Sequence, residues 1–447
     1  MTTQEGSIAS VEAGLVAWVR QAAPYIHAFR GRTFVIAFGG EVLEAGPAAA
    51  QSLAQDFNLL ESLGIRLVLV HGARPQIDAE LQRRGLTPRF HKGLRVTDGA
   101  ALECVKSAMG VTRIEIEALL SQGLPNTPMA GAWMRVTGGN FITAKPVGVV
   151  GGVDYQYTGA VRKINAEEIR ADLNQQNVVL ITPLGVSPTG EIFNLAWEEV
   201  AETVAVSLKA DKLIFLCGAL GLTDKKARLI EAITADEADG LLSRRIKQAP
   251  ELARVLPGAL RACRAGVGRV HFIDSRADGA MLMEFFTRAG AGTVMTQAPL
   301  ARLREATVDD VGSVLALIAP LESDGTLVKR GRERIEMEIG RFSVLDHDGV
   351  IVGCAALYPF GGEQAAEMAC LAVMPEYRRS GYGDQLMRHI EARAKRLKLK
   401  RLFVLTTRTA HWFIERGFAE TSVLELPEAK RELYNYQRRS KILAKSL

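Results

Sequence analysis

Short apolar runs alternate with helical patterns over the first two thirds of the chain. Two runs each predict a buried strand that leads into a turn, FVIAFGGEVL at 34–43 and RLVLVHGARPQ at 66–76. Further buried strands are predicted at 178–182, 213–217 and 269–273, and helices at 11–29, 50–63, 76–84, 165–173, 197–210 and 278–289. Strands that are apolar on both faces and alternate with helices indicate a parallel α/β sheet with helices on each side.

The pattern changes near residue 298. After QAPLAR, the chain predicts a short strand, a polar turn and a helix in RLREATVDDVGSVLALIAPL, and then two apolar strands around Asp-His-Asp-Gly at 343–360. Asp-Gly between such runs predicts a hairpin. A chain of 447 residues also exceeds the size of most single hydrophobic cores. We therefore expect two domains, 1–298 and 299–447, with the boundary in the stretch 296–302.

Composition and charge are those of an ordinary globular protein. Hydrophobic residues make up 48% and charged residues 23%, and the net charge is +5. Because no block of like charge is present, no nucleic-acid partner is expected. The sequence contains no apolar run of membrane-spanning length, and its first residues do not resemble a signal peptide. Five scattered cysteines without a CxxC pair argue against disulfides and zinc. We expect a cytoplasmic protein that needs neither a membrane nor a metal.

The most specific motif begins at Glu367 and reads EMACLAVMPEYRRSGYGDQLMRHIEARAK. A strand over 369–374 ends at Pro375, and the stretch Arg378-Arg379-Ser380-Gly381-Tyr382-Gly383 leads into a helix that begins near Asp384. A glycine-bearing loop that opens a helix presents free backbone N–H groups and the positive end of the helix dipole. Such a loop suits a pyrophosphate, which the glycines let approach closely and the arginines help to neutralise.

This R-x-x-G-x-G loop, placed between a strand and a helix, resembles the pyrophosphate loop of the Gcn5-related N-acetyltransferase family. The resemblance covers 302–447 and includes RLFVLTT at 401–407 and the later HWFIERGF. It implies an α/β domain with splayed strands and acetyl-CoA as the cosubstrate. The implied cofactor-binding residues are Leu371, Ala372 and Val373 for the pantetheine arm and the thioester carbonyl, and Arg378, Arg379, Ser380, Gly381, Tyr382 and Gly383 for the pyrophosphate.

Acetyl transfer needs a general base, because an ammonium cannot attack a thioester until it loses a proton. Glu367, at the start of the cofactor strand in an apolar run, is the predicted base. Its alternative role is that of a glutamate at the rim of a sheet. An acid for the departing thiolate is harder to find, because the tyrosine that the family often carries is Phe413 in this sequence. Thr406 is the remaining candidate, unless the thiolate leaves without a protein acid.

The first domain resembles the amino-acid kinases, and acetylglutamate kinase in particular, at FVIAFGGEVL and LVLVHGARPQID. Two positions depart from the family. Ala37 replaces the lysine that neutralises the transferring phosphoryl group, and Ala73 and Arg74 replace glycines that let ATP phosphates approach. We therefore expect a parallel-sheet sandwich of the amino-acid-kinase type that phosphorylates nothing.

The two domains together resemble the bacterial N-acetylglutamate synthases over essentially the whole chain. The resemblance is close at GIRLVLVHGARPQID, HKGLRVTD, GNFITAKP, CRAGVGRVHF, EMACLAV and YNYQRRSKIL. It implies direct transfer of an acetyl group to L-glutamate, giving N-acetyl-L-glutamate and CoA, the first step of arginine biosynthesis.

A dicarboxylate acceptor needs cations, and the second domain offers them. The implied acceptor-binding residues are Leu327, Lys329, Arg330, Cys370, Arg438 and Ser440. We expect Arg438 and Ser440 in the last strand. Lys329 stands where the family commonly has arginine, which grips a carboxylate with two hydrogen bonds. Each basic residue has an ordinary surface charge as its alternative role.

The same resemblance implies feedback inhibition by L-arginine, bound in the kinase-like domain. The implied residues are Tyr25, Lys212, Glu284 and Thr293. The alternative for Glu284 is a solvated helix face. The N-terminal helix resembles the segment that pairs kinase-like domains into hexamers.

Other functions remain open at this point. One is an acetyltransferase for another small amine or a protein lysine, with the kinase-like domain as a sensor, but the basic residues around the proposed acceptor site argue against it. Another is a regulatory binding protein with both sites inactive, which the intact loop at 378–383 argues against. A residual kinase activity is the least favoured, because Ala37 replaces the lysine.

Overall fold

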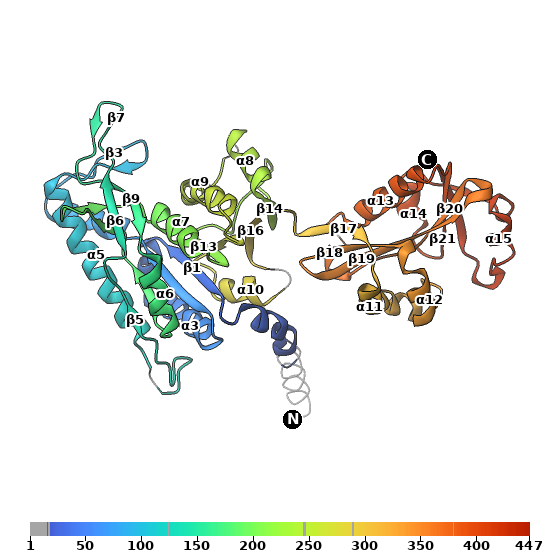
Figure 1. Cartoon of the computed structure of the whole chain (residues 1–447), viewed down its shortest axis with the longest axis horizontal. Coiled ribbons are helices and arrows are strands. Elements are labelled where there is room, and N and C mark those ends of the chain that lie inside the picture. Colours follow the sequence, from blue (N-terminus) through green and yellow to red (C-terminus); the bar gives the residue numbers. More distant parts are fainter. Residues whose placement is uncertain (1–15, 17, 124, 245–246, 288–289, 379) are drawn as a thin grey trace, which may run out of the picture. The chain divides into compact units, whose positions relative to one another are not determined.

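The computed structural model describes residues 16, 18–123, 125–244, 247–287, 290–378 and 380–447. The chain divides into two compact units, Met1–Ala298 and Pro299–Leu447. Each unit has its own central sheet (Figure 1). None of the helices in these described ranges is long and apolar enough to cross a membrane.

An eight-stranded sheet forms the centre of the first unit, and all its neighbouring pairs are parallel except β15–β16. From edge to edge the strands are β14 (Ala232–Thr234), β16 (Gly292–Thr296), β15 (Arg269–Asp274), β13 (Lys212–Cys217), β1 (Thr33–Phe38), β2 (Arg66–His71), β10 (Val178–Ile181) and β5 (Val136–Thr137). The continuous apolar run of β1 explains its central place, because successive side chains point to opposite faces and both faces are covered.

Helices cover the two faces of this sheet. Val35 and Ala37 of β1 pack into the core with α6 (Ala166–Asn174), α7 (Trp197–Leu208), α8 (Ala235–Ser243) and α9 (Pro250–Arg264). Phe34, Ile36 and Phe38 pack into the other core with α3 (Pro47–Ser62), α5 (Gly99–Leu120) and α10 (Ala280–Phe286). The predicted α/β sandwich is therefore confirmed.

The two glycine turns end their strands earlier than the apolar pattern predicts. β1 stops at Phe38, where Gly39 and Gly40 lead into the short helix α2 (Glu41–Glu44), and β2 stops before α4 (Arg74–Arg83). The turns pack against each other: a Cβ on Gly72 would lie 3.2 Å from Gly39 Cα and 2.7 Å from Trp197 Cδ1. Close backbone packing thus explains why glycine is needed at Gly72.

Smaller sheets complete the first unit, and the sequence pattern did not predict them. A four-stranded sheet has the order β12 (Ile192–Asn194), β11 (Leu184–Val186), β6 (Ile142–Pro146) and β9 (Gly159–Ile164). Two hairpins pair β3 (Phe90–His91) with β4 (Leu94–Arg95), and β7 (Val149–Val150) with β8 (Val153–Asp154). At the N-terminus, residues 16 and 18–29 are helical, while the rest of the helix predicted at 11–29 lies outside the described residues.

The second unit is built on a seven-stranded sheet in which only β20 and β21 run parallel. Its order is β17 (Ala301–Glu305), β18 (Phe342–His347), β19 (Val350–Phe360), β20 (Ala365–Val373), β21 (Arg401–Thr406), β23 (Lys441–Ser446) and β22 (Ala419–Thr421), and its helices are α11 (Val311–Ser323), α12 (Arg332–Glu338), α13 (Tyr382–Arg396), α14 (Ala410–Ile414) and α15 (Glu428–Arg431). The predicted hairpin joins β18 to β19. Asp348 (φ 56°) and Gly349 (φ 80°) form its turn, since a two-residue turn of this kind needs positive φ at both positions.

Candidate functional site

The strands β20 and β21 separate partway along the sheet of the second unit. They pair only from Ala365–Arg401 to Glu367–Phe403, although β20 continues to Val373 and β21 to Thr406. The register of β20 against β19 also shifts near Cys370, whose φ is 52°. Such a bulge bends a strand. Beyond Glu367, the β21 side of β20 therefore offers backbone groups that no ladder uses.

The loop after β20 leads into the N-terminus of α13. Gly381 (φ 73°) is the N-cap residue, and no side chain caps the helix. The first N–H groups of α13 have no partner inside the helix and point along its positive end. Arg378 and Ser380 are exposed beside them, and the ring centroids of Tyr377 and Tyr382 stack 5.8 Å apart. Arg379 lies outside the described residues.

A contact that the sequence did not predict holds this helix end. Arg416 forms an ion pair with Asp384 in the first turn of α13 and also donates to the Trp412 carbonyl at 2.8 Å. A Cβ on Gly383 would lie 3.2 Å from Trp412 Cζ2, so glycine lets the indole pack here. Phe413 is 6% exposed and packs on Phe418, so it belongs to the core.

Glu367 is the last residue of β20 that pairs with β21, and it is 8% exposed. Lys430 of α15 places its Nζ 2.6 Å from Glu367 Oε2. The sequence did not predict this ion pair, because 63 residues separate the two partners along the chain. This ion pair thus lies at the point where the two strands part.

Thr406 is the last residue of β21, in the part of this strand that pairs with β23 but no longer with β20. Its Oγ1 is 2.9 Å from Thr409 Oγ1 and accepts the Thr409 N–H at 3.1 Å. Three residues separate Thr406 from Phe403, the partner of Glu367, which corresponds to about 10 Å along the strand. The fold therefore does not bring Thr406 directly beside Glu367.

The loop after α11 is anchored by two arginines. Arg438 Nη2 donates to the carbonyls of Gly325 (2.9 Å) and Thr326 (2.6 Å). Arg408, just beyond β21, donates to Asp324 Oδ2 at 3.0 Å. The fold thus brings Arg438 next to the segment that carries Leu327, Lys329 and Arg330, which were all predicted to bind the acceptor.

Two of the residues predicted to bind the acceptor share a buried cluster. Leu327 and Cys370 pack with the same core residues, whereas Lys329 is exposed. Arg330 is half-buried, with its guanidinium carbon 5.9 Å from the centroid of the Tyr358 ring. Burial raises the pKa of the Cys370 thiol to about 11. The Cys370 thiol is therefore protonated at neutral pH.

The predicted placement of Arg438 and Ser440 in the last strand is wrong. β23 begins only at Lys441, and Arg438 ends the short 3₁₀ helix Tyr436–Arg438. Arg439 follows with φ 49°, a left-handed conformation that interrupts an extended chain. Tyr434 then donates to the Ser440 carbonyl at 2.8 Å. This turn directs Arg438 toward the 325–326 carbonyls, which a strand would not do.

A buried polar chain joins two of the residues expected to bind arginine. Lys212 Nζ lies 3.0 Å from His271 Nε2, and His271 Nδ1 lies 2.7 Å from Glu284 Oε1. Burial lowers the pKa of His271 to about 4, and the Lys212 charge adds to this effect. The ring is therefore neutral at neutral pH, so Nδ1–H donates to Glu284 and Nε2 accepts from Lys212.

Glu284 does not lie on a solvated helix face, because its side chain is only 5% exposed. Its Oε2 accepts the N–H groups of Ala291 (2.7 Å) and Gly292 (3.0 Å). Tyr25 approaches the chain through Phe29, whose ring lies 4.9 Å from Lys212 Nζ. The sequence did not predict that His271 links Lys212 to Glu284. The one signal for this link is a histidine inside an apolar strand.

Thr293 directly follows Gly292, whose N–H Glu284 accepts, but the Thr293 hydroxyl bonds to other residues. Its hydroxyl donates to the Ile230 carbonyl at 2.6 Å and accepts the Leu222 N–H at 2.9 Å.

Across the described ranges, no group of three or more histidine, cysteine, aspartate or glutamate side chains could hold a metal ion.

Comparisons with known proteins agree with this geometry. The amino acid kinase family matches residues 32–274, and the acetyltransferase (GNAT) family matches residues 316–418. The amino-acid acetyltransferase of Ralstonia nicotianae is 51% identical over 97% of this chain and 95% of the relative, and that of Azotobacter vinelandii is 52% identical over 97% and 99%.

Two solved structures match along almost the whole chain. The N-acetylglutamate synthase of Neisseria gonorrhoeae complexed with coenzyme A and L-arginine is 40% identical, with a TM-score of 0.85 over 97% of this chain and 99% of that one. The same enzyme complexed with coenzyme A and N-acetyl-glutamate has a TM-score of 0.61 at the same identity and coverage. The predicted two-part fold and the predicted acetyltransferase activity are confirmed. The chain belongs to the amino-acid acetyltransferases, in which an amino-acid-kinase-like unit precedes an N-acetyltransferase unit.

Proposed function

We propose that this protein transfers the acetyl group of acetyl-CoA directly to the amine of L-glutamate, giving N-acetyl-L-glutamate and CoA as the first step of arginine biosynthesis in the cytoplasm. The observation that carries this proposal is the separation of β20 from β21 immediately after Glu367. The loop that follows β20 then leads into the start of α13, which no side chain caps. The likeness to the synthase that binds coenzyme A and N-acetyl-glutamate supports the choice of acceptor.

Acetyl-CoA fits this arrangement along its length. Its pyrophosphate would accept hydrogen bonds from the free N–H groups of α13, with Arg378 adding positive charge. Its pantetheine arm would lie along Leu371–Val373, where β20 has no ladder on its β21 side. An N–H of this stretch would polarise the thioester carbonyl and stabilise the negative charge that develops on its oxygen.

The acceptor would lie between the anchored loop and Glu367. Lys329, Arg330 and Arg438 provide the positive charge for two carboxylates, and Glu367 takes the proton of the ammonium. The amine nitrogen then attacks the thioester carbon, and the carbon–sulfur bond breaks. We propose direct transfer, and burial of the Cys370 thiol, which raises its pKa to about 11, disfavours an acyl-enzyme at this residue. We assign Thr406 as the proton donor to the thiolate, with release of the thiolate to solvent as the alternative.

A thiol-release assay tests the acceptor. Purified protein with acetyl-CoA and a panel of amines is expected to release CoA with L-glutamate, at a kcat/KM at least about tenfold above that for L-aspartate or a lysine peptide. Comparing the amines of this panel distinguishes glutamate from another small amine or a protein lysine as the acceptor. Release with another amine, but not with glutamate, would contradict the proposal.

We also propose that the kinase-like unit has no phosphotransferase activity. Ala37 is fully buried in the sheet, where it pairs with Val70 and Phe215. A methyl group at this position supplies no charge to a phosphoryl group. The glycine turns pack against each other and against Trp197, as described above.

Instead of transferring phosphate, the kinase-like unit would bind L-arginine as an effector at the Lys212–His271–Glu284 chain. A guanidinium pairs with a carboxylate through two hydrogen bonds, which Glu284 can accept if the ligand displaces part of this chain. The synthase complexed with L-arginine supports this proposal. Feedback inhibition also requires that the protein adopts two conformations and that L-arginine binds one of them more tightly than the other.

Glu284→Gln is expected to weaken inhibition by L-arginine about tenfold or more, because the amide lacks the charge that pairs with a guanidinium. Activity without arginine should stay near the wild-type value. Inhibition curves for Glu284→Gln and for Glu168→Gln, an exposed position on α6, measure the effect. An unchanged arginine response in Glu284→Gln would remove this residue from the effector site.

The N-terminal helix supports a proposed homo-oligomer, a hexamer in which kinase-like units pair. Val16, Trp18 and Val19 are 47%, 39% and 51% exposed. Residues three apart lie on the same face of a helix, so Val16 and Val19 present apolar surface together. Such a face favours burial against a second helix.

A further inference from the structure

The ammonium of Lys430 reaches Glu367 from a helix that is not part of the sheet. Its Nζ lies 2.6 Å from Glu367 Oε2, and the Lys430 side chain is 22% exposed. Within the described residues, no hydrogen bond or ion pair engages Glu367 Oε1. One oxygen of the carboxylate is therefore held by a cation, and the other is left for a ligand.

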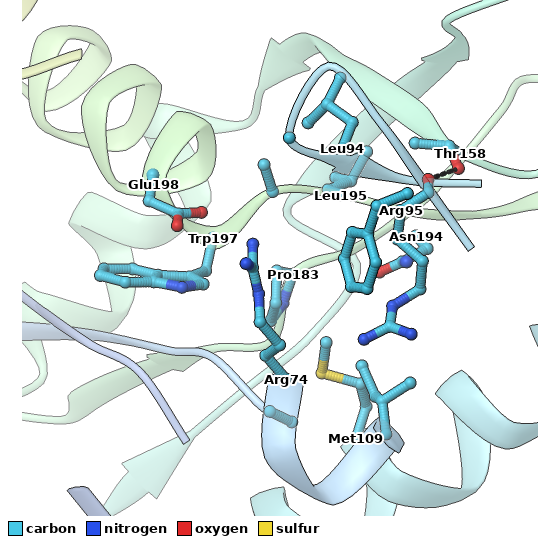
Figure 2. A pocket seen from close by; sticks show the side chains of 15 residues that line it. Arg74, Leu94, Arg95, Met109, Thr158, Pro183, Asn194, Leu195, Trp197 and Glu198 are labelled. Carbon is cyan, nitrogen blue, oxygen red and sulfur yellow. Dashed lines mark hydrogen bonds between the residues drawn. The ribbon is translucent and has the colours of Figure 1, made fainter. Parts of the chain in front are cut away.

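Ion pairs with one largely buried partner also occur elsewhere in the chain. In the first unit, Arg95, which Figure 2 shows among the residues that line a pocket, pairs with Asp78 at 2.6 Å. In the second unit, Lys445 Nζ pairs with Glu391 Oε1 at 2.7 Å. Such pairing offsets the desolvation of a charge and does not by itself indicate catalysis. The pair at Glu367 differs from these two because it lies where β20 and β21 part.

The segment that leads into α15 is fixed to the strands that carry this carboxylate. Leu426 is 3% exposed and belongs to the same buried cluster as Phe403, the partner of Glu367 in the β20–β21 ladder. Glu363, in the turn between β19 and β20, accepts the Glu428 N–H at 2.8 Å at the start of α15. These contacts hold the backbone of α15 in place against β20 and β21.

The same segment continues from α15 to the proposed acceptor site. Tyr434 packs against this buried cluster, and its hydroxyl donates to the Ser440 carbonyl at 2.8 Å. Arg438 lies between these two residues and donates to the carbonyls of the loop at 325–326. One anchored segment therefore carries both Lys430 and Arg438, so the position of the one is tied to that of the other.

Burial makes the cation at Glu367 important for the state of the carboxylate. Glu367 is 8% exposed, and Lys430 is its one ion-pair partner among the described residues. Arg330 acts on Glu367 through its charge but forms no ion pair with it. A desolvated carboxylate that loses its cation takes up a proton or turns toward water. A general base can do neither, because it must be ionised and within hydrogen-bond reach of the proton that it accepts.

We propose that Lys430 is a positioning residue for acetyl transfer, which keeps the Glu367 carboxylate ionised and holds its Oε2, so that Oε1 can accept the proton of the acceptor ammonium. This inference rests on the proposed function, in which Glu367 is the base. The proton moves from the acceptor nitrogen to Glu367, and the lone pair left on the nitrogen then attacks the thioester carbon. In this role Lys430 binds neither substrate and transfers no proton.

Lys430→Met is expected to lower kcat for acetyl transfer to glutamate about tenfold or more, because the base is no longer held in place. The KM values for glutamate and acetyl-CoA should stay within about twofold of the wild type, since neither binding site is changed. Lys430→Arg, which restores a cation, should recover most of the lost kcat. Steady-state kinetics of CoA release by the full chain measure these constants, and thermal melting verifies that each variant is folded.

Lys445→Met is the matched control. It breaks an ion pair of similar length and burial that lies between β23 and α13, and it should retain the wild-type kcat. A double variant gives a second test. In Glu367→Gln protein, which lacks the base, adding Lys430→Met should change kcat by less than about twofold, because two residues that act as a unit are not additive.

Four results would overturn the proposal. They are a wild-type kcat in Lys430→Met, a raised KM for glutamate with an unchanged kcat, an equal loss of kcat in Lys445→Met, or a further tenfold loss in the double variant. The raised KM would show that Lys430 binds the acceptor instead. A wild-type kcat in Lys430→Met beside an impaired Glu367→Gln overturns this inference alone. If the wild type releases CoA only with another amine, the choice of glutamate fails, and the variants are compared with that amine.

Discussion

Glu367→Gln is expected to lower kcat for acetyl transfer about a hundredfold or more, because an amide cannot accept the proton that the acceptor ammonium must lose before its nitrogen can attack. The exchange is nearly isosteric, so the strand pairing of β20 and the KM for acetyl-CoA should change little. The carboxylate is 8% exposed at the last paired position of β20, and Lys430 is its partner. Steady-state kinetics with glutamate and acetyl-CoA measure both constants.

A matched control separates loss of the base from loss of an ion pair. Glu420 on β22 also pairs with a lysine, Lys441, but it is exposed. Glu420→Gln should therefore retain turnover. A kcat of Glu367→Gln within about threefold of the wild-type value would remove Glu367 from the role of base.

Arg438→Ala is expected to raise the KM for glutamate by on the order of ten- to a hundredfold, with a much smaller effect on the KM for acetyl-CoA. Two effects combine, because the change removes a cation from the proposed acceptor site and releases the carbonyls of Gly325 and Thr326. Loss of one charge-assisted contact alone accounts for a change of this order.

The effect of releasing the loop carbonyls can be measured separately with a variant of Arg408. This residue anchors the same loop at Asp324, but we do not assign it to the acceptor. Arg408→Ala should therefore raise the KM for glutamate less than Arg438→Ala does. Equal effects of the two variants would show that Arg438 acts only as a loop anchor. Equal effects of Arg438→Ala on both substrates would contradict its assignment to glutamate.

Features that depend on neighbouring residues could be predicted from the sequence. The apolar run of β1 predicted a buried central strand, and Asp348-Gly349 predicted the β18–β19 hairpin. The loop at 378–383 also belongs to this class, because a strand, two glycines and a helix start lie consecutively. In each case the physical cause is local: side-chain periodicity, positive φ or an uncapped helix end.

Other expectations failed because tertiary contacts decide where a local element ends. The strand predicted for Arg438 and Ser440 is replaced by a 3₁₀ turn, whose arginine reaches a loop more than a hundred residues earlier in the chain. Glu284 looked equally suited to a solvated helix face, yet His271 and two backbone N–H groups enclose it. Neither outcome follows from the residues next to these positions.

The sequence by itself determined the two-part α/β fold and the glycine-bearing loop that opens α13, and it placed Glu367 in the strand before this loop. Only the tertiary structure decided that β20 and β21 part at Glu367, that Lys430 pairs with Glu367, and that Arg438 anchors the loop at Gly325 and Thr326. The reason is physical. Secondary structure and helix-end electrostatics arise within a few residues, whereas ion pairs and desolvated charges depend on which distant segments the packing of the core brings together.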